Sequence, residues 1–156
     1  MSSLSFSTAT VQLLTAADVA EVVEIERLSN SHPWTERNFN DALASGYLCL
    51  VAREEAAVSG FAVARLLVDE AELLLIAVTP ERRRQGVAHL LWIELAARLQ
   101  ASGARTVHFE VRESNLSAQA FYRSRGFTQS GIRPKYYPNG AHESEREDAV
   151  MMKVSL

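Results

Sequence analysis

Three consecutive arginines, Arg82, Arg83 and Arg84, stand just before a segment whose apolar residues recur at helical spacing. The first turn of a helix carries partial positive charge, so three cations there are unfavourable unless an anion binds among them. Gly86 lets the backbone approach such an anion, and the small Ala88 keeps the next turn uncrowded. The segment therefore predicts a cradle for a pyrophosphate group. A run of arginines alone is more often a solvated basic turn, so the prediction depends on the rest of the chain.

A second candidate for chemistry is the segment 106–112, which reads as a strand. Period-two alternation places apolar side chains on one face and His108, Glu110 and Arg112 on the other. A strand between two helices in the sequence is expected in the middle of a sheet, covered on both faces. A polar face there indicates a cavity or a ligand, where a partly desolvated Glu110 would serve as a general base. The alternative, to which the spacing gives equal weight, is that these residues pair with one another at a sheet edge.

The third candidate is a helix predicted over 115–125. Tyr122 lies one turn beyond Ala118 and two turns beyond Asn115, so the three residues share one face. Asn115 is also a favourable N-cap. A tyrosine on a helix face is usually a core residue with its hydroxyl at the rim, and the spacing alone favours that interpretation.

The remaining elements must position these groups. Apolar periodicity predicts strands at 10–14, 47–53, 59–68, 72–78, 106–112, 127–131 and 147–154, and helices at 15–29, from 35 onward, at 85–101 and at 115–125. A polar loop is predicted from about Pro134 to Glu145. The order β-α-α-β-β-β-α-β-α-β-β predicts an α/β fold with a mixed sheet.

The second predicted helix has a well-marked start. Thr35 is a good N-cap, and Trp34 and Phe39 are spaced to form a hydrophobic staple across it. This pair would fix the angle at which the preceding loop enters the helix.

Composition indicates one globular domain over residues 1–156, with residues 1–9 flexible. The chain has 156 residues, of which 47% are hydrophobic and 22% charged, so it is too short for two comfortable domains. A net charge of -3 gives no general preference for nucleic acid or for an anionic membrane. The single Cys49 excludes an internal disulfide and a thiol-based zinc site, and we expect no metal. No apolar run approaches the roughly 20 residues of a spanning helix, and no signal peptide is evident, so we expect a cytoplasmic protein.

Two motifs together resemble the GCN5-related N-acetyltransferases, the GNAT family. The first is the loop motif Arg83-x-x-Gly86-x-Ala88. The second is the helix motif Asn115-x-x-Ala118-x-x-Phe121-Tyr122-x-x-x-Gly126-Phe127, which follows the loop at the distance expected for this family. The resemblance extends from about Thr10 to the C-terminus.

Further segments resemble one branch of that family, the bacterial ribosomal-protein alanine N-acetyltransferases (RimI-type). These segments are His32-Pro33-Trp34, Asp69-Glu70-Ala71, Ile76-Ala77-Val78, Glu110-Val111-Arg112-x-Ser114-Asn115, Tyr136-Tyr137-Pro138 and Arg146-Glu147-Asp148-Ala149. The fold that this resemblance implies is a mixed, mostly antiparallel central sheet of about seven strands flanked by about four helices.

The resemblance also implies an activity. Acetyl-CoA would be the co-substrate, and the acceptor would be a protein N-terminal amine, with the N-terminal alanine of ribosomal protein S18 as the expected one. The amine would attack the thioester directly, with Glu110 as the general base and Tyr122 as the general acid. No nucleic acid or membrane partner is expected.

The cofactor-binding residues follow from the same resemblance. The main chain of Ile76, Ala77 and Val78 would bind the acetyl and pantetheine part, and Asn115 would touch the cofactor. The residues that would wrap the pyrophosphate are Arg83, Arg84, Gln85, Gly86, Val87, Ala88 and His89.

Three departures from the branch bear on the acceptor and the loop. Leu75 stands where an asparagine is common, and Ala88 stands where glycine is commoner. The stretch after Pro138 is longer than expected and carries the acidic residues Glu143, Glu145, Glu147 and Asp148. This acidic loop would either receive a basic peptide or form a solvated hairpin tip.

Two other functions stay open at this point. A lysine side chain or a small amine would use the same cofactor, although an unprotonated lysine is scarcer because its pKa is about 10.4. A catalytically silent acyl-CoA-binding domain is the third possibility, and the presence of both Glu110 and Tyr122 argues against it.

Overall fold

A seven-stranded sheet organises the computed structural model, which describes residues 8–138 and 145–156. The strands are β1 (Thr10–Leu13), β2 (Leu48–Glu54), β3 (Ala57–Leu67), β4 (Glu70–Val78), β5 (Thr106–Arg112), β6 (Thr128–Pro138) and β7 (Arg146–Ser155). The helices are α1 (Val19–Ser29), α2 (Glu36–Ala44), α3 (Val87–Ala101) and α4 (Leu116–Ser124), with short 3-10 turns at Ala16–Asp18 and Pro80–Arg82. This is the predicted order of elements. The expectations for residues 1–7 and for Glu143 lie outside the described residues.

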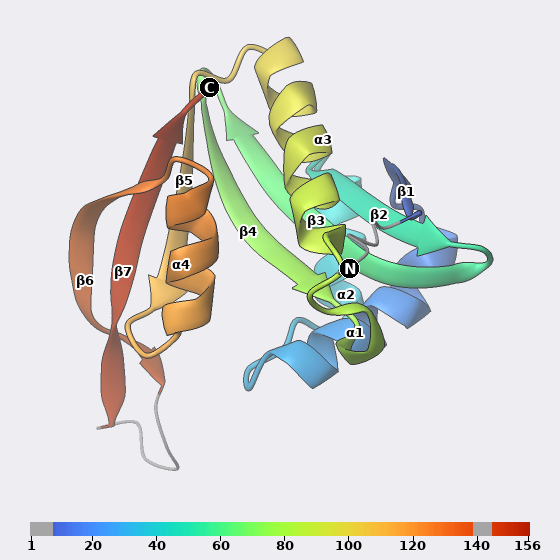
Figure 1. Ribbon diagram of the computed structural model, residues 1–156, viewed down its shortest axis with the longest axis horizontal. Coiled ribbons are helices and arrows are strands. Elements are labelled where there is room, and N and C mark those ends of the chain that lie inside the picture. The colour runs from blue at the N-terminus through green and yellow to red at the C-terminus, as the bar shows by residue number, and fades with distance from the viewer. Residues whose placement is uncertain (1–7, 139–144) are drawn as a thin grey trace, which may run out of the picture.

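The strands lie in the order β1-β2-β3-β4-β5-β7-β6. In the described part of the chain, β4 and β5 form the parallel pair, and the other neighbours are antiparallel. The predicted mixed, mostly antiparallel sheet with four helices is therefore confirmed. Figure 1 shows β4 and β5 close together near the C-terminus and spread apart toward their other ends.

Helices cover both faces of the sheet. In Figure 1, α3 and α4 lie on the face toward the viewer, and α1 and α2 lie behind. The core beneath α3 and α4 includes Leu91, Leu95, Leu99, Val107 and Tyr122. The core beneath α1 and α2 includes Val22, Ile25, Phe39, Phe61 and Val63. β4 therefore contributes residues to both cores, which agrees with its largely apolar sequence, whereas β5 contributes Val107, Phe109 and Val111 to the core beneath α3 and α4.

The predicted start of α2 is confirmed. The Thr35 side chain accepts a hydrogen bond from the Asn38 backbone N–H at 3.2 Å, and the Asn38 side chain accepts one from the Thr35 N–H at 2.9 Å. The rings of Trp34 and Phe39 are in edge contact with centroids 5.4 Å apart, as a staple requires. The loop before α2 is therefore fixed at both its cap and its aromatic end.

The predicted start of the loop at Pro134 is wrong, because β6 continues through Pro138, and residues 139–144 of that prediction lie outside the described residues. The strand accommodates Pro134, which has no N–H to donate, through a register irregularity between Arg133 and Tyr137. Lys135 adopts a left-handed backbone with φ 49°, and its N–H donates to the Asp148 side chain at 2.9 Å. Sequence reasoning treated the proline as the end of the strand, whereas the side chain of Asp148 supplies a partner for the distorted backbone.

Candidate active site

The parallel pairing of β4 with β5 stops partway along both strands. Four residue pairs join them, from Glu70 with Thr106 to Leu73 with Phe109, and no pair follows in the described structure. Beyond this point β4 still pairs with β3, and β5 still pairs with β7. Each strand therefore presents one unpaired backbone edge to the space between them. We call this space the split, and the pair Leu73–Phe109 its vertex.

A bulge in β4 accounts for the divergence. Val63 of β3 pairs with Leu75 and Ala64 pairs with Leu73, which leaves Leu74 as an extra residue on β4. A bulge of this kind bends its strand and increases the local twist. β4 therefore turns away from β5 immediately after the vertex.

The predicted residues Ile76, Ala77 and Val78 lie on the unpaired edge of β4, and all three are half-buried. Backbone N–H and C=O groups at a half-buried edge need hydrogen-bond partners, which a bound ligand can provide. The structure thus places these three residues where their main chain faces the split, as the predicted role requires.

The predicted pyrophosphate loop leads from β4 to the N-terminus of α3. Gly86 has φ +82° and Arg84 has φ +62°, so two residues of the loop adopt the left-handed backbone conformation just before the helix. The first turn of α3 contains no acidic side chain, and no side chain caps it. Successive backbone N–H groups in such a turn, together with the helix dipole, form an anion-binding concavity. This arrangement fits a pyrophosphate group.

The three arginines of this loop have different partners. Arg82 forms an ion pair with Glu54 at 2.9 Å. Arg83 donates from Nε to the Val78 carbonyl at 3.1 Å and from Nη2 to Ser29 Oγ at 3.3 Å, so its side chain ties the loop to β4 and α1.

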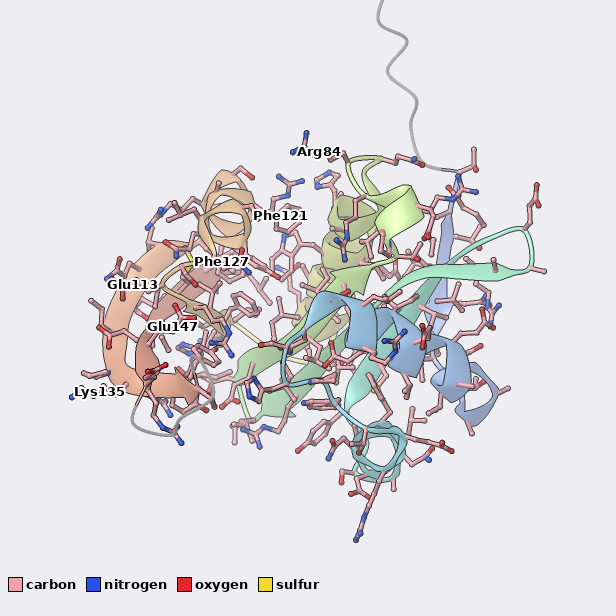
Figure 2. The ribbon with its side chains drawn as sticks, turned by 90° about the horizontal axis from the view of Figure 1, so that it is seen from below. Arg84, Glu113, Phe121, Phe127, Lys135 and Glu147 are labelled. Atoms are coloured by element: carbon pink, nitrogen blue, oxygen red, sulfur yellow. The ribbon has the colours of Figure 1, made fainter. Side chains whose placement is uncertain are left out.

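Arg84 differs from both neighbours. Its exposed side chain has no hydrogen bond or ion pair with the residues that the structure describes, and it lies at the outer edge of the molecule in Figure 2. Among the three cations, Arg84 is therefore the one available to an anion. The other predicted cradle residues vary in burial, with Val87 buried, Gln85 and Ala88 half-buried, and Gly86 and His89 exposed.

Gly60 of β3 allows the start of α3 to sit against the sheet. A Cβ atom at this position would lie 2.8 Å from the Ala77 carbonyl oxygen, 3.2 Å from Leu91 Cδ1 and 3.2 Å from Val87 Cγ1. The first of these separations is too short for any real Cβ contact. The absence of a side chain at Gly60 thus brings the cradle helix close to the β4 edge of the split. No motif in the sequence pointed to this residue.

Tyr122 of α4 lies beside the vertex, on the face covered by α3 and α4. Its ring centroid is 4.2 Å from that of Phe109, and the rings of Phe121 and Phe127 enclose it at 5.1 and 5.2 Å. Figure 2 shows Phe121 on the side of α4 that faces α3. The Tyr122 hydroxyl is buried and has no hydrogen-bond partner among the described residues, and burial raises the pKa of Tyr122 far above its usual value. A protonated hydroxyl left unpaired at this point fits a ligand that accepts a hydrogen bond.

Glu110 follows Phe109 on β5 and points to the opposite face. Its Oε1 atom lies 2.8 Å from Nη2 of Arg133, which comes from β6. The side chain of Glu110 is 27% exposed, so it is shielded without being enclosed. Burial, the nearby Glu110 carboxylate and Tyr136 raise the pKa of Tyr137 to about 12. The predicted base and the predicted acid therefore flank the vertex from the two faces of the sheet.

A second ion pair holds the β6–β7 arm against β5. Arg112 Nη1 lies 2.9 Å from Oε1 of Glu147 and donates to the Pro138 carbonyl at 2.8 Å. The guanidinium also lies over the Tyr137 ring, 4.7 Å from its centroid. Glu147, labelled in Figure 2, accepts a further hydrogen bond from the Ser114 N–H at 3.1 Å.

These contacts decide between the two interpretations of the polar face of β5. The residues of this face do not pair with one another at an edge, because β5 lies between β4 and β7. Glu110 and Arg112 instead contact Arg133 and Glu147 on the two strands beyond. Sequence reasoning missed these partners, since cross-strand register is not readable from one strand's alternation.

The predicted cofactor contact Asn115 caps α4. Its Oδ1 atom accepts from the Ala118 N–H at 3.2 Å, which confirms the predicted N-cap. The buried Gln119 donates to the carbonyls of Arg112 and Glu113 at 3.1 and 2.9 Å and so fixes the turn between β5 and α4. Asn115 is exposed at the start of this helix.

An apolar wall lies on the α1–α2 side of the sheet. Trp34, Tyr47, Leu74 and Leu75 are half-buried and pack against the core beneath α1 and α2. The buried Glu26 carboxylate accepts a hydrogen bond from the Trp34 N–H at 2.9 Å and so holds the α1–α2 loop in place. With Leu75 in this wall, the surface is apolar where the branch commonly has an asparagine.

No helix in the described part of the chain is both long enough and apolar enough to cross a membrane. No group of three or more His, Cys, Asp or Glu side chains there is placed to hold a metal ion.

The chain is similar to known acetyltransferases over nearly its whole length. It is 34% identical over 147 residues to the [Ribosomal protein bS18]-alanine N-acetyltransferase of Escherichia coli strain K12, covering 94% of this chain and 97% of that protein. The crystal structure of the ribosomal-protein-S18-alanine N-acetyltransferase from Escherichia coli superposes with a TM-score of 0.86, covering 95% of this chain and 94% of that one.

A phosphinothricin acetyltransferase from Sinorhizobium meliloti, solved in complex with AcCoA, is 27% identical with a TM-score of 0.79 and covers 96% of this chain and 89% of that one. A sequence model described as the Acetyltransferase (GNAT) family matches residues 19–127. With its split sheet, basic loop and helix motif, the chain belongs to the acetyltransferase (GNAT) family.

Proposed function

We propose that this protein transfers the acetyl group of acetyl-CoA to the N-terminal alanine of ribosomal protein S18. The single observation that carries this proposal is the vertex, where an unpaired backbone edge, a shielded carboxylate and a buried hydroxyl meet. The similarity to bS18-alanine N-acetyltransferases over 94% of the chain supports the choice of acceptor. The proposal treats the chain as a single acetyltransferase domain, and an acceptor on a ribosomal protein would place it in the cytoplasm.

The proposed binding site for acetyl-CoA runs along the split, on the face of the sheet that α3 and α4 cover. The pyrophosphate would bind at the left-handed turns of Arg84 and Gly86 and at the first turn of α3. The pantetheine arm would form hydrogen bonds with the unpaired backbone groups of Ile76, Ala77 and Val78. Asn115 would contact the cofactor from the start of α4. When bound, acetyl-CoA supplies the acetyl group as a thioester.

In this proposal Glu110 removes the proton that blocks the acceptor. An α-ammonium group has a pKa of roughly 8, so at neutral pH it has to lose one proton before its nitrogen lone pair can attack. The Glu110 carboxylate would take that proton, directly or through a water molecule, from the face opposite α4. The freed nitrogen forms the new bond to the acetyl carbon while the carbon–sulfur bond breaks. As the amide forms, the nitrogen releases its second proton to solvent, from which Tyr122 regains the proton that it gives to the sulfur.

Tyr122 supplies the second proton in this scheme. Its raised pKa keeps the hydroxyl protonated at any working pH, so it is available as a donor to the departing sulfur. Main-chain N–H groups on the β4 edge would stabilise the negative charge that develops on the carbonyl oxygen.

The acceptor peptide would enter between the β6–β7 arm and the α1–α2 loop. This entrance combines the apolar wall of Trp34, Tyr47, Leu74 and Leu75 with the carboxylate of Glu110. A small uncharged first side chain such as alanine suits the wall, and the α-ammonium suits the carboxylate. The wall gives no polar partner at Leu75, so main-chain contacts of the peptide would fix its register.

Intact-mass spectrometry of two peptides tests the proposal. One peptide has a free N-terminal alanine followed by basic residues and no lysine, and the other has the same sequence with a blocked α-amine and one lysine. We expect one added acetyl group on the first peptide and none on the second. Acetylation of the blocked peptide alone would assign the enzyme to lysine side chains. No acetylation of either, with acetyl-CoA bound, would exclude a peptide acceptor of both kinds.

A further inference from the structure

The Glu110 carboxylate is held by an arginine from a strand that does not neighbour β5. Arg133 lies on the edge strand β6, and β7 runs between β6 and β5. Arg133 pairs with Ala149 of β7, and Ala149 pairs with Arg112 of β5, so these side chains lie on one face. Because Ala149 carries only a methyl group, the Arg133 side chain can pass over β7 and reach Glu110, with Nη2 2.8 Å from Oε1.

Other groups limit the freedom of this guanidinium. Its carbon lies 4.7 Å from the centroid of the Tyr136 ring, a cation–π contact on the same strand. The backbone between them is set by the left-handed Lys135, whose N–H is bonded to Asp148. An exposed arginine usually loses conformational entropy when it forms an ion pair, and these contacts reduce that loss.

We propose that Arg133 is a positioning residue for acetyl transfer, which fixes the Glu110 carboxylate at the vertex so that it meets the acceptor ammonium. The inference rests on the proposed function, since it assigns Arg133 a role through the proposed base. A guanidinium stays charged at every working pH and neither takes nor gives a proton in the reaction. Its effect is to hold one orientation of the carboxylate and to balance its charge while the site is shielded from water.

A second ion pair of the chain provides a matched control. Arg98 Nε of α3 lies 2.7 Å from Oε1 of Glu94, with 39% and 40% of the side chains exposed. This pair has nearly the same length, but both residues lie on α3, one turn apart, with Arg98 in the last turn of the helix. An ordinary surface ion pair has little effect on stability or activity, which is the expectation for Arg98.

The test compares turnover of wild type, Arg133→Gln, Arg98→Gln, Glu110→Gln and the double variant Glu110→Gln/Arg133→Gln on the alanine peptide. Arg133 is 48% exposed on an edge strand, so its substitution should leave the fold intact, and thermal unfolding checks this. We expect Arg133→Gln to lower kcat by about tenfold, the loss typical of one charge-assisted contact. The Kd of Arg133→Gln for acetyl-CoA, measured by calorimetry, and the turnover of Arg98→Gln should each change by less than about twofold.

The double variant distinguishes a positioning role from a general structural one. If Arg133 acts through Glu110, its substitution has no further effect on kcat once Glu110 is glutamine. An equal loss in both backgrounds would overturn the inference, as would normal kcat in Arg133→Gln. In either case a slow Glu110→Gln variant leaves the proposed function standing. Full turnover in Glu110→Gln would remove the base assignment and this inference together, and a wild-type enzyme inactive on the peptide would contradict the proposed acceptor.

Discussion

Leu73 and Phe109 form the last backbone pair between β4 and β5, and the proposed chemistry is arranged around this pair. The residue after Phe109 is Glu110, which points to one face, and the ring of Phe109 itself contacts Tyr122 on the other. A sheet that was paired along its whole length would have no open edge here and would separate the two groups. The end of the pairing therefore opens free backbone groups at the point where the base lies on one face of the sheet and the acid on the other.

Substitution of Tyr122 by phenylalanine should separate catalysis from stability. The hydroxyl is buried without a partner among the described residues, so its removal should leave the free energy of unfolding unchanged or slightly higher. We expect kcat to fall by about tenfold or more, because the sulfur would lose its proton donor. Denaturant unfolding and steady-state turnover measure the two effects. Normal turnover would show that solvent protonates the thiolate.

Gly60→Ala should displace the start of α3, which forms part of the proposed pyrophosphate site. The added methyl group would have to displace the Ala77 carbonyl or the first turn of α3, and overpacking of this kind costs roughly 1–3 kcal/mol. We expect a lower free energy of unfolding together with weaker acetyl-CoA binding. Gly131→Ala is the control, because a Cβ there would meet nothing closer than Met151 Sδ at 3.7 Å. Equal effects of the two substitutions would contradict the packing role of Gly60.

Arg84→Ala should weaken acetyl-CoA binding. Its guanidinium has no partner in the described structure and stands beside the helix N-terminus, so the loss of one phosphate contact should raise Kd by roughly tenfold. The effect should shrink at high salt. Arg98→Ala provides the comparison, since Arg98 lies in the last turn of α3 and pairs with Glu94. Calorimetry that gives the same Kd for Arg84→Ala and wild type would exclude this arginine from the anion site.

The buried Glu26 predicts a specific dependence of stability on pH. Burial raises the pKa of Glu26 above its ordinary 4.5, against the opposing hydrogen bonds from Trp34 and Asn30. The folded protein thus binds this proton more tightly than the unfolded chain does. The tighter binding of this proton stabilises the folded protein. This contribution is fully present below about pH 4.5 and is lost as the pH rises through the pKa that Glu26 has in the folded protein.

Glu26→Gln should remove this contribution while keeping an oxygen that can accept from the Trp34 N–H. We expect the variant to gain stability relative to wild type as pH rises from 4 to 8, because it avoids a buried charge. Denaturant unfolding at several pH values measures the difference. If the free energies of unfolding of the variant and the wild type keep a constant difference across this pH range, the pKa of Glu26 is the same in the folded and the unfolded protein.

Much of the fold was accessible from the sequence because it depends on local signals. The caps Thr35 and Asn115 and the Trp34–Phe39 staple are local, and each formed as predicted. The two faces of β5 also followed from alternation alone. The extent of β6 did not, because Pro134 reads as a break, and the side chain that accepts a hydrogen bond from the next N–H, that of Lys135, is Asp148 on another strand.

The site was only partly accessible for the same reason. Motif spacing identified the loop and the α4 helix. The end of the β4–β5 pairing depends on a bulge at Leu74, which no local sequence pattern predicts. Gly60 and Arg133 act across strands, so their importance becomes visible only with the register. Arg83, which the loop motif suggested as a cofactor contact, uses its side chain to bond Val78 and Ser29.

The proposed mechanism depends above all on Glu110, which removes a proton from the α-ammonium group of the peptide at the vertex of the split. Its most direct test is the single-turnover rate of acetyl transfer to the alanine peptide by Glu110→Gln, with the Kd for acetyl-CoA measured on the same sample. General-base catalysis typically contributes 10²–10⁴-fold, so we predict a fall of about 100-fold or more with a Kd within about twofold of wild type. An unchanged rate at saturating acetyl-CoA would contradict the claim.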